Sequence, residues 1–139
     1  MNYKKNFFHV ENISTEKLSK RFKTPLYCYS YLKIKSNITN FKNHFKKTKP
    51  LICFSVKSNS NVKILKEIKN LGLGADVVSK GEMMKALKAG IRTKKIVFSG
   101  VGKTYSELEY AINKNILLIN VESKSELLVI EKIAKLKRK

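Results

Sequence analysis

Residues 74–91 read GADVVSKGEMMKALKAGI and contain one complete strand–turn–helix unit. The first six residues are typical of a short buried strand, although Asp76 interrupts the apolar run. Ser79 and Glu82 stand three residues apart, the spacing of a capping box, in which both side chains bind free amides of a first helical turn. Gly90 then supplies a helix stop. The stretch therefore predicts a strand that is followed directly by a helix.

Similar units precede and follow this stretch. Three more strand-like runs lie at 51–57, 95–100 and 116–121, so that successive strands begin about 21 to 23 residues apart. The last two runs are followed by further S/T-x-x-E boxes, which begin at Thr104 and Ser123. Strands that are joined by helical crossovers run parallel to one another. The repeats therefore predict a parallel sheet built from four strand–helix units.

Four such units make half of an eight-unit barrel, or else a small open α/β sheet. Within residues 51–57, bulky side chains alternate with smaller or polar ones. Bulky residues against helices and polar residues inward are typical of a barrel interior near its catalytic rim. We therefore predict an α/β fold of parallel strand–helix repeats that form about half of a (β/α)8 TIM-type barrel, truncated in this chain. Residues 1–49 are predicted to form a strand and helix leading into the barrel, and residues 50–139 its four units.

The composition describes a globular protein with an unusual charge. The chain has 139 residues, of which 42% are hydrophobic and 29% charged, and its formal net charge is +20. Such a charge raises the possibility of a nucleic-acid-binding module. However, only three of the 30 basic residues are arginines, and the lysines are scattered along the whole chain. Nucleic-acid surfaces usually concentrate charge and use arginine, so a solvated lysine-rich surface is favoured and nucleic-acid binding remains an alternative.

The cysteines and histidines show no ligand pattern. Cys28 and Cys53 lie in apolar runs without metal or redox spacing, and His9 and His44 have no partners at ligand spacing. No apolar stretch approaches the roughly 20 residues of a membrane span. The N-terminus lacks the apolar core and cleavage site of a signal peptide. We therefore predict no metal site, reduced thiols and a cytoplasmic location.

Lys57 is the main candidate for chemistry. The apolar run before it leads straight into this lysine, and a Ser/Asn turn follows at once. Parallel sheets carry their chemistry at the carboxyl ends of the strands, where a lysine amine can condense with a carbonyl. Asp76, in the next strand, would face the same rim. The competing interpretations are a plain surface lysine at 57 and a turn or cap carboxylate at 76.

Several segments together resemble the diaminopimelate decarboxylases, a family of pyridoxal-phosphate (PLP) enzymes of the alanine-racemase/ornithine-decarboxylase fold type. The likeness runs from about Thr24 to Ala134 and is carried by TPLYCYS (24–30), ICFSVKSNSNVKIL (52–65), LGLGADVVSKGEMMKALKAGI (71–91), KIVFSGVGKTYSELEYAI (95–112) and INVESKSEL (119–127). The combination of VKSNSN with GADVVSKGE and VFSGVGKT is highly specific to this family.

The resemblance implies a role for each matching residue. Lys57 would be the catalytic residue and would bind PLP covalently. Asp76 would lie near the cofactor ring, and Ser55 would line the pocket under the ring at a position that is usually alanine in the family. The implied reaction is decarboxylation of meso-2,6-diaminopimelate to L-lysine and CO2 in lysine biosynthesis. Another fold-type-III PLP decarboxylase or PLP-binding protein is the nearest alternative.

The resemblance covers only the N-terminal portion of the family's sequence. The later histidine that stacks on the ring, the glycine-rich phosphate loop and the acidic partner of the pyridine nitrogen have no counterpart in this chain. We therefore expect these residues alone to have little or no decarboxylase activity. The expected partners are an amino-acid substrate and either a second copy, as in the homodimers of the family, or a chain that supplies the complementing C-terminal half. No membrane partner is expected.

Overall fold

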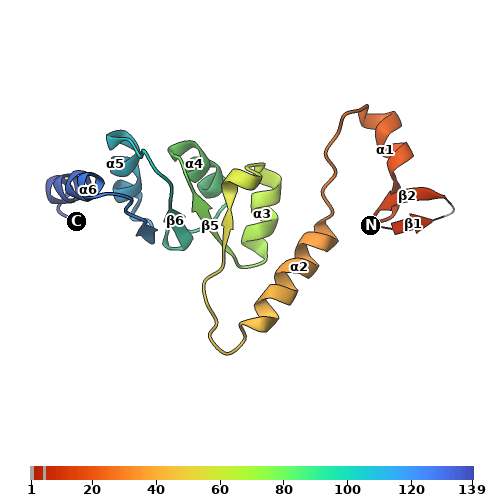
Figure 1. Ribbon diagram of the computed structural model, residues 1–139, viewed down its shortest axis with the longest axis horizontal. Helices are drawn as coiled ribbons and strands as arrows, with labels where there is room; N and C mark the ends of the chain where they lie inside the picture. The colour runs from red at the N-terminus through yellow and green to blue at the C-terminus, as the bar shows by residue number, and fades with distance from the viewer. Residues whose placement is uncertain (1, 5) are drawn as a thin grey trace. The chain divides into compact units, whose positions relative to one another are not determined.

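The computed structural model describes residues 2–4 and 6–139 (Figure 1). The chain divides into two compact units, Met1–Lys49 and Pro50–Lys139. None of the described helices is long and apolar enough to cross a membrane.

The first unit combines a small antiparallel sheet with two helices. The sheet has the strand order β1-β2-β3. Ser14 and Ser30 begin the two helices, because each hydroxyl accepts a hydrogen bond from an amide of the first turn. The elements in chain order are β1 (Asn2–Lys4), β2 (Phe7–Val10), β3 (Ile13–Ser14), α1 (Thr15–Phe22) and α2 (Tyr31–His44).

The second unit consists of four strands, each followed by a helix. The sheet has the order β4-β5-β6-β7, and every neighbouring pair is parallel. This arrangement confirms the predicted α/β fold of parallel strand–helix repeats. The elements are β4 (Cys53–Ser55), the 3-10 turn η1 (Val56–Ser58), α3 (Val62–Asn70), β5 (Gly74–Val77), α4 (Lys80–Lys88), the 3-10 turn η2 (Thr93–Lys95), β6 (Ile96–Phe98), α5 (Tyr105–Lys114), β7 (Leu118–Ile119) and α6 (Lys124–Lys137).

The hydrophobic core lies between one face of this sheet and its helices. Alternate residues of β5 and β6 are completely buried there, together with residues of α3, α4 and α5. The opposite face is only half-buried along β4 to β6 and carries Ser55 in β4, Asp76 in β5 and Val97 in β6, so the two faces of the sheet differ in chemistry. Helices packed on a single face are what the wall of a barrel requires. The buried cluster contains Leu65, Ala75, Val77, Met83, Ala86, Ile96, Phe98 and Ala111.

The strand that precedes Lys57 is shorter than the sequence predicted. β4 ends at Ser55, and Lys57 lies in the turn η1 rather than at the end of the strand. Two local hydrogen bonds turn the chain early: the Asn59 amide donates to the Val56 carbonyl at 3.0 Å, and the Ser58 hydroxyl donates to the Ser55 carbonyl at 2.7 Å. The prediction of a strand over 51–57 is therefore wrong at both ends, since β4 also begins only at Cys53.

The predicted starts of α4, α5 and α6 are confirmed, but only one of the three capping boxes is complete. Ser79, Thr104 and Ser123 each accept from the amide three residues later. The Glu107 carboxylate completes the box at Thr104 by accepting from the Thr104 amide. Its other oxygen accepts from the Lys80 amide at 3.0 Å, which joins the starts of α4 and α5.

The other two carboxylates bind elsewhere. Glu82 accepts from the amide of Val78, one residue before the expected partner, at 2.9 Å. Glu126 pairs with Lys103 in the loop after β6. The sequence pattern therefore identified the helix starts correctly and assigned two of the carboxylates to the wrong donors.

Gly74 lies at a close approach of β5 to neighbouring backbone. A Cβ atom at this position would collide with the carbonyl oxygen of Lys95 and would stand 2.8 Å from the sulfur of Cys53. We expect Gly74→Ala to lower the free energy of unfolding by about 1–3 kcal/mol, because the backbone carbonyl cannot move aside without disturbing the sheet. Chemical denaturation followed by circular dichroism measures this change.

Gly81→Ala is the matched control. Gly81 lies in the first turn of α4, where a new Cβ would meet only the Ser79 hydroxyl, at 3.8 Å. There the substitution is expected to be neutral or to stabilise by up to about 1 kcal/mol, since alanine restricts the unfolded chain and favours a helix. Equal destabilisation by the two substitutions would contradict the close approach at Gly74.

Candidate active site at the carboxyl ends of the strands

Four polar side chains form a hydrogen-bonded row across the polar face of the sheet. Ser55 belongs to β4 and Asp76 to β5, and the two are Cα partners in the parallel register. Ser99 and Asn120 follow β6 and β7 directly. The Ser55 hydroxyl donates to Asp76 Oδ2 at 3.5 Å, Ser99 donates to Asp76 Oδ1 at 2.5 Å, and Asn120 Nδ2 donates to Ser99 Oγ at 2.9 Å. We call these four residues the polar row.

Lys57 lies just beyond the β4 end of the polar row. Its side chain is exposed, in the turn η1. Across residues 2–4 and 6–139, no hydrogen bond, ion pair or ring contact of the Lys57 amine is found. Because β4 and β5 are parallel, Lys57 and Asp76 lie at the same end of adjacent strands. The uncommitted amine of Lys57 and the carboxylate of Asp76, which the protein holds in place, thus belong to adjacent chain segments at one end of the sheet.

These residues suit an aldehyde cofactor. An amine without a competing partner can bond covalently to an aldehyde carbon. A carboxylate beside it can orient the cofactor or neutralise a positive charge on it. The described residues contain no group of three or more His, Cys, Asp or Glu side chains that could hold a metal ion. The predicted residues Lys57, Asp76 and Ser55 thus have side chains of the kind that a carbonyl-containing ligand would require.

Cys53 lies two residues before Ser55 in β4, close to the backbone of η2. Its thiol is 3.9 Å from the Lys95 carbonyl oxygen. Burial, and then the negative charge of Asp76, raises the pKa of the Cys53 thiol. A raised pKa keeps the sulfur protonated and weakly nucleophilic, so the Cys53 thiol is poorly suited to act as a nucleophile.

Lys103 is a buried cation that the sequence analysis did not single out. Only 1% of its side chain is exposed. Its ammonium donates to the carbonyls of Gly100 and Asn120, both at 2.7 Å, and to the Glu126 carboxylate at 2.9 Å. It also lies 5.6 Å from the centre of the Phe98 ring. All three ammonium protons are used, so Lys103 joins the ends of β6 and β7 to the start of α6 and is not available for chemistry.

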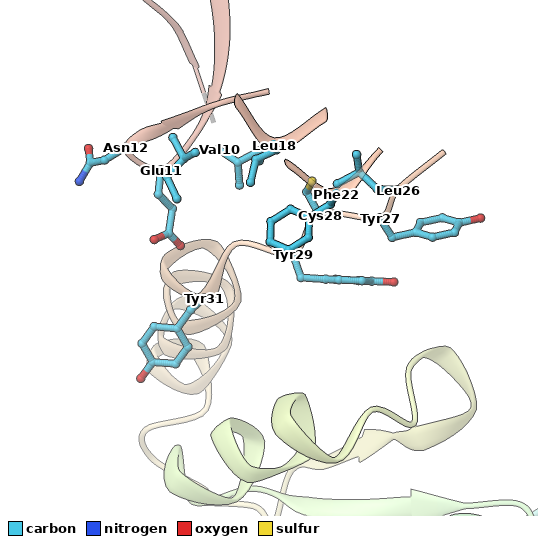
Figure 2. A pocket seen from close by; sticks show the side chains of 11 residues that line it. Val10, Glu11, Asn12, Leu18, Phe22, Leu26, Tyr27, Cys28, Tyr29 and Tyr31 are labelled. Atoms are coloured by element: carbon cyan, nitrogen blue, oxygen red, sulfur yellow. The ribbon is translucent and has the colours of Figure 1, made fainter. Parts of the chain in front are cut away.

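A separate groove of about 630 Å3 lies in the first unit (Figure 2). Its walls are mostly aromatic and aliphatic. The Glu11 carboxylate points toward the first turn of α2, where it accepts from the Ser30 hydroxyl at 2.8 Å and from the Leu32 amide at 3.0 Å. The bond from the Leu32 amide has the larger effect and the bond from the Ser30 hydroxyl the next largest, and both lower the pKa of Glu11. The only carboxylate of the groove is therefore already engaged, and the groove offers no reactive group comparable to Lys57.

Comparison with known proteins gives a consistent result. Residues 32–138 match the family described as "Pyridoxal-dependent decarboxylase, pyridoxal binding domain". A diaminopimelate decarboxylase from Helicobacter pylori is 55% identical over 119 residues, which cover 86% of this chain and 29% of that protein. The chain therefore spans a little under a third of the length of this relative.

Solved structures agree with the sequence match. The crystal structure of diaminopimelate decarboxylase from Helicobacter pylori complexed with L-lysine is 50% identical, with a TM-score of 0.85 over 89% of this chain and 32% of that one. The enzyme from M. jannaschii in co-complex with L-lysine is 36% identical, with a TM-score of 0.88 over 99% of this chain and 33% of that one.

Proposed function

The chain belongs to the pyridoxal-dependent decarboxylase family, and from this premise we propose that it forms the N-terminal part of a PLP-dependent diaminopimelate decarboxylase. The proposed reaction is the conversion of meso-2,6-diaminopimelate to L-lysine and CO2. The observation that carries the proposal is the uncommitted amine of Lys57 in the turn that directly follows β4, at the same end of the sheet as the hydrogen-bonded carboxylate of Asp76 on the adjacent strand β5. The substrate assignment is supported by the relatives named diaminopimelate decarboxylase.

Each residue of the site has a proposed task. Lys57 would hold the cofactor covalently through its side-chain amine. Asp76 would orient the cofactor from the neighbouring strand, and Ser55 would line the pocket beside it. Bound PLP supplies the electron sink that makes loss of CO2 from an amino acid possible. The chain's own contribution is therefore attachment and orientation.

The remaining assignments belong to the same proposal. We propose that residues 50–139 provide four units of the PLP-binding barrel and that residues 1–49 lead into it. The substrate is an amino acid, and the protein partner is either a second copy or a polypeptide that carries the complementing C-terminal half. A cytoplasmic location is in keeping with the free thiols Cys28 and Cys53.

Trapping with borohydride tests the proposal directly. The purified protein is incubated with PLP, reduced with borohydride, digested, and mapped by mass spectrometry. We expect the phosphopyridoxyl label on Lys57 to exceed that on any other lysine by at least about tenfold, because a single positioned amine outcompetes freely solvated ones. Lys57→Ala should remove this label.

Lys63→Ala is the matched control for the trapping experiment. Lys63 is an exposed lysine on α3, close in sequence to Lys57. Its replacement should leave the label on Lys57 unchanged. Labelling that is spread evenly over many lysines and insensitive to Lys57→Ala would refute the proposed function and favour a protein whose lysines only provide surface charge.

A further inference from the structure

The polar row has a defined direction of hydrogen bonding. Asn120 Nδ2 can only donate, so the Ser99 oxygen accepts its proton. Ser99 has a single proton of its own, and this proton is therefore directed at Asp76 Oδ1. The Ser55 hydroxyl donates to the other oxygen of the same carboxylate. Both oxygens of Asp76 thus accept from the protein, and every donor in the row points toward Asp76.

The two bonds to Asp76 differ in length, and the difference identifies the residue that matters more. The bond from Ser99 is 2.5 Å long, whereas the bond from Ser55 is 3.5 Å long. Hydrogen bonds between oxygen atoms are normally 2.5–3.0 Å long, so the contact at 3.5 Å is weak. Without the Ser99 hydroxyl, Asp76 would keep only the weak contact. The orientation of its carboxylate therefore depends on Ser99, and Asn120 fixes the orientation of Ser99.

The side chains of Ser99 and Asn120 are not needed to hold the strand ends together. Backbone bonds already do this: the Ser99 amide donates to the Val77 carbonyl at 2.8 Å, and the Asn120 amide donates to the Phe98 carbonyl at 2.9 Å. Both side chains lie on the polar side of the sheet, opposite the hydrophobic core, and Asn120 is exposed. Truncating either side chain consequently leaves the sheet pairing and the core intact.

We propose that Ser99 and Asn120 are positioning residues, which hold the Asp76 carboxylate in the orientation in which it acts on the cofactor bound at Lys57. This inference deepens the proposed function and rests on it, because the proposed function supplies the cofactor on which Asp76 would act. The positioning of Asp76 itself can be tested without any ligand. Neither residue touches the Lys57 amine. Both act through Asp76, and their effects must disappear when Asp76 is removed.

The first test uses nuclear magnetic resonance on the protein without PLP. Asp76→Ala should shift the side-chain amide resonances of Asn120, although these two residues are connected only through Ser99. Ser99→Ala should shift both the Asn120 amide and the Asp76 carboxylate resonances. Ser36→Ala, at an exposed position on α2, should shift neither. Unchanged Asn120 resonances in Asp76→Ala would overturn the proposal.

The second test measures the affinity of PLP for Lys57 by borohydride trapping at graded PLP concentrations. Ser99→Ala should weaken the apparent affinity about tenfold, the loss expected for one hydrogen bond to a charged group. Ser99→Thr, which keeps the hydroxyl, should restore most of it. In an Asp76→Ala background, Ser99→Ala should have no further effect, because its action passes through Asp76. Circular dichroism confirms that each variant is folded.

Asn120→Ala completes the second test, with Asn113→Ala as its control. Asn113 is an exposed asparagine on α5. Asn120→Ala should weaken PLP affinity by a smaller factor than Ser99→Ala, and Asn113→Ala should leave it unchanged. Effects of Ser99→Ala and Asp76→Ala that simply multiply in the double variant would overturn the proposal, because they would show that Ser99 acts independently of Asp76.

The two tests separate failure of this inference from failure of the proposed function. If PLP does not label Lys57 in the unmodified protein, the proposed function is refuted, and the resonance shifts alone decide whether Ser99 and Asn120 position Asp76. If PLP labels Lys57 but Ser99→Ala and Asn120→Ala leave its affinity unchanged, the proposed function stands and the positioning role is refuted.

Discussion

Replacing Lys103 by methionine is expected to lower the free energy of unfolding by about 3–5 kcal/mol. The substitution removes a buried positive charge and leaves the Glu126 carboxylate, only 9% exposed, without its partner. It also leaves the carbonyls of Gly100 and Asn120 without the donor that they now share. An unpaired buried charge costs far more than the loss of the ion pair itself. Denaturant titration of the purified variant measures the change.

Two variants serve as controls for this prediction. Lys135→Met breaks an ion pair with Glu131 in which both side chains are well exposed, so its effect should stay within about 1 kcal/mol. The double variant Lys103→Met, Glu126→Leu removes both buried charges and should recover part of the lost stability. A change of less than 1 kcal/mol for Lys103→Met would show that water reaches this ion pair freely.

Residues 1–139, assayed as a separate polypeptide, are expected to turn over meso-diaminopimelate at least about a thousandfold more slowly than the Helicobacter pylori relative. One reason lies at β7, which pairs only with β6 among the described strands. The polar row therefore ends at an open edge, and water has free access to the site from that side. Steady-state release of CO2, measured with saturating PLP, gives the turnover.

The phosphate group of PLP provides a second reason. Helix N-termini commonly bind phosphate through free first-turn amides. Each of the six described α-helices begins with a Ser, Thr or Asn side chain that already accepts from one of these amides. The ammonium of Lys103 is also fully engaged. Each described helix start is thus already partly capped by its own chain, so none offers its full set of free amides to a phosphate dianion.

Complementation provides the control for the activity prediction. Exposed leucines surround the open edge, with Leu118 51% and Leu128 57% exposed, beside a groove of about 330 Å3 between α5, β7 and α6. A polypeptide that carries the remaining two thirds of the Helicobacter pylori relative should bind here and restore activity. Turnover by residues 1–139 alone at the rate of the relative would contradict the proposal that later residues complete the site.

The sequence predicted those parts of the fold that depend on neighbouring residues. The starts of α4, α5 and α6 followed from hydroxyl residues at Ser79, Thr104 and Ser123, because a cap acts within one helical turn. The parallel order of the strands followed from their spacing. The end of β4 could not be predicted from the sequence, because the bond from the Asn59 amide to the Val56 carbonyl forms a turn where the strand could have continued. The alternation of apolar and polar residues contains no information about that turn.

Contacts between distant residues were harder to predict. Glu126 has the spacing of a capping carboxylate, yet it binds Lys103, 23 residues earlier, because a buried ammonium is a stronger donor than a partly solvated amide. The polar row did leave a signal in the sequence. Its three hydrogen bonds span 21, 23 and 21 residues, which is the length of the strand–helix repeat. A search for polar residues at the repeat spacing would have found Ser99 and Asn120.

Links between consecutive strand–helix units make their unfolding cooperative. Lys85 donates to Ser60 at 2.8 Å, the Lys80 amide donates to Glu107 at 3.0 Å, and Lys103 pairs with Glu126. Loss of one unit therefore removes a partner from the next, so melting cannot stay confined to one repeat. Acid acts on the central link: the amides of Lys80 and then Thr104 lower the pKa of Glu107. The contribution of the ionised Glu107 carboxylate to folding stability is complete above its unfolded-state pKa. It is lost as the pH falls through the lower folded-state pKa.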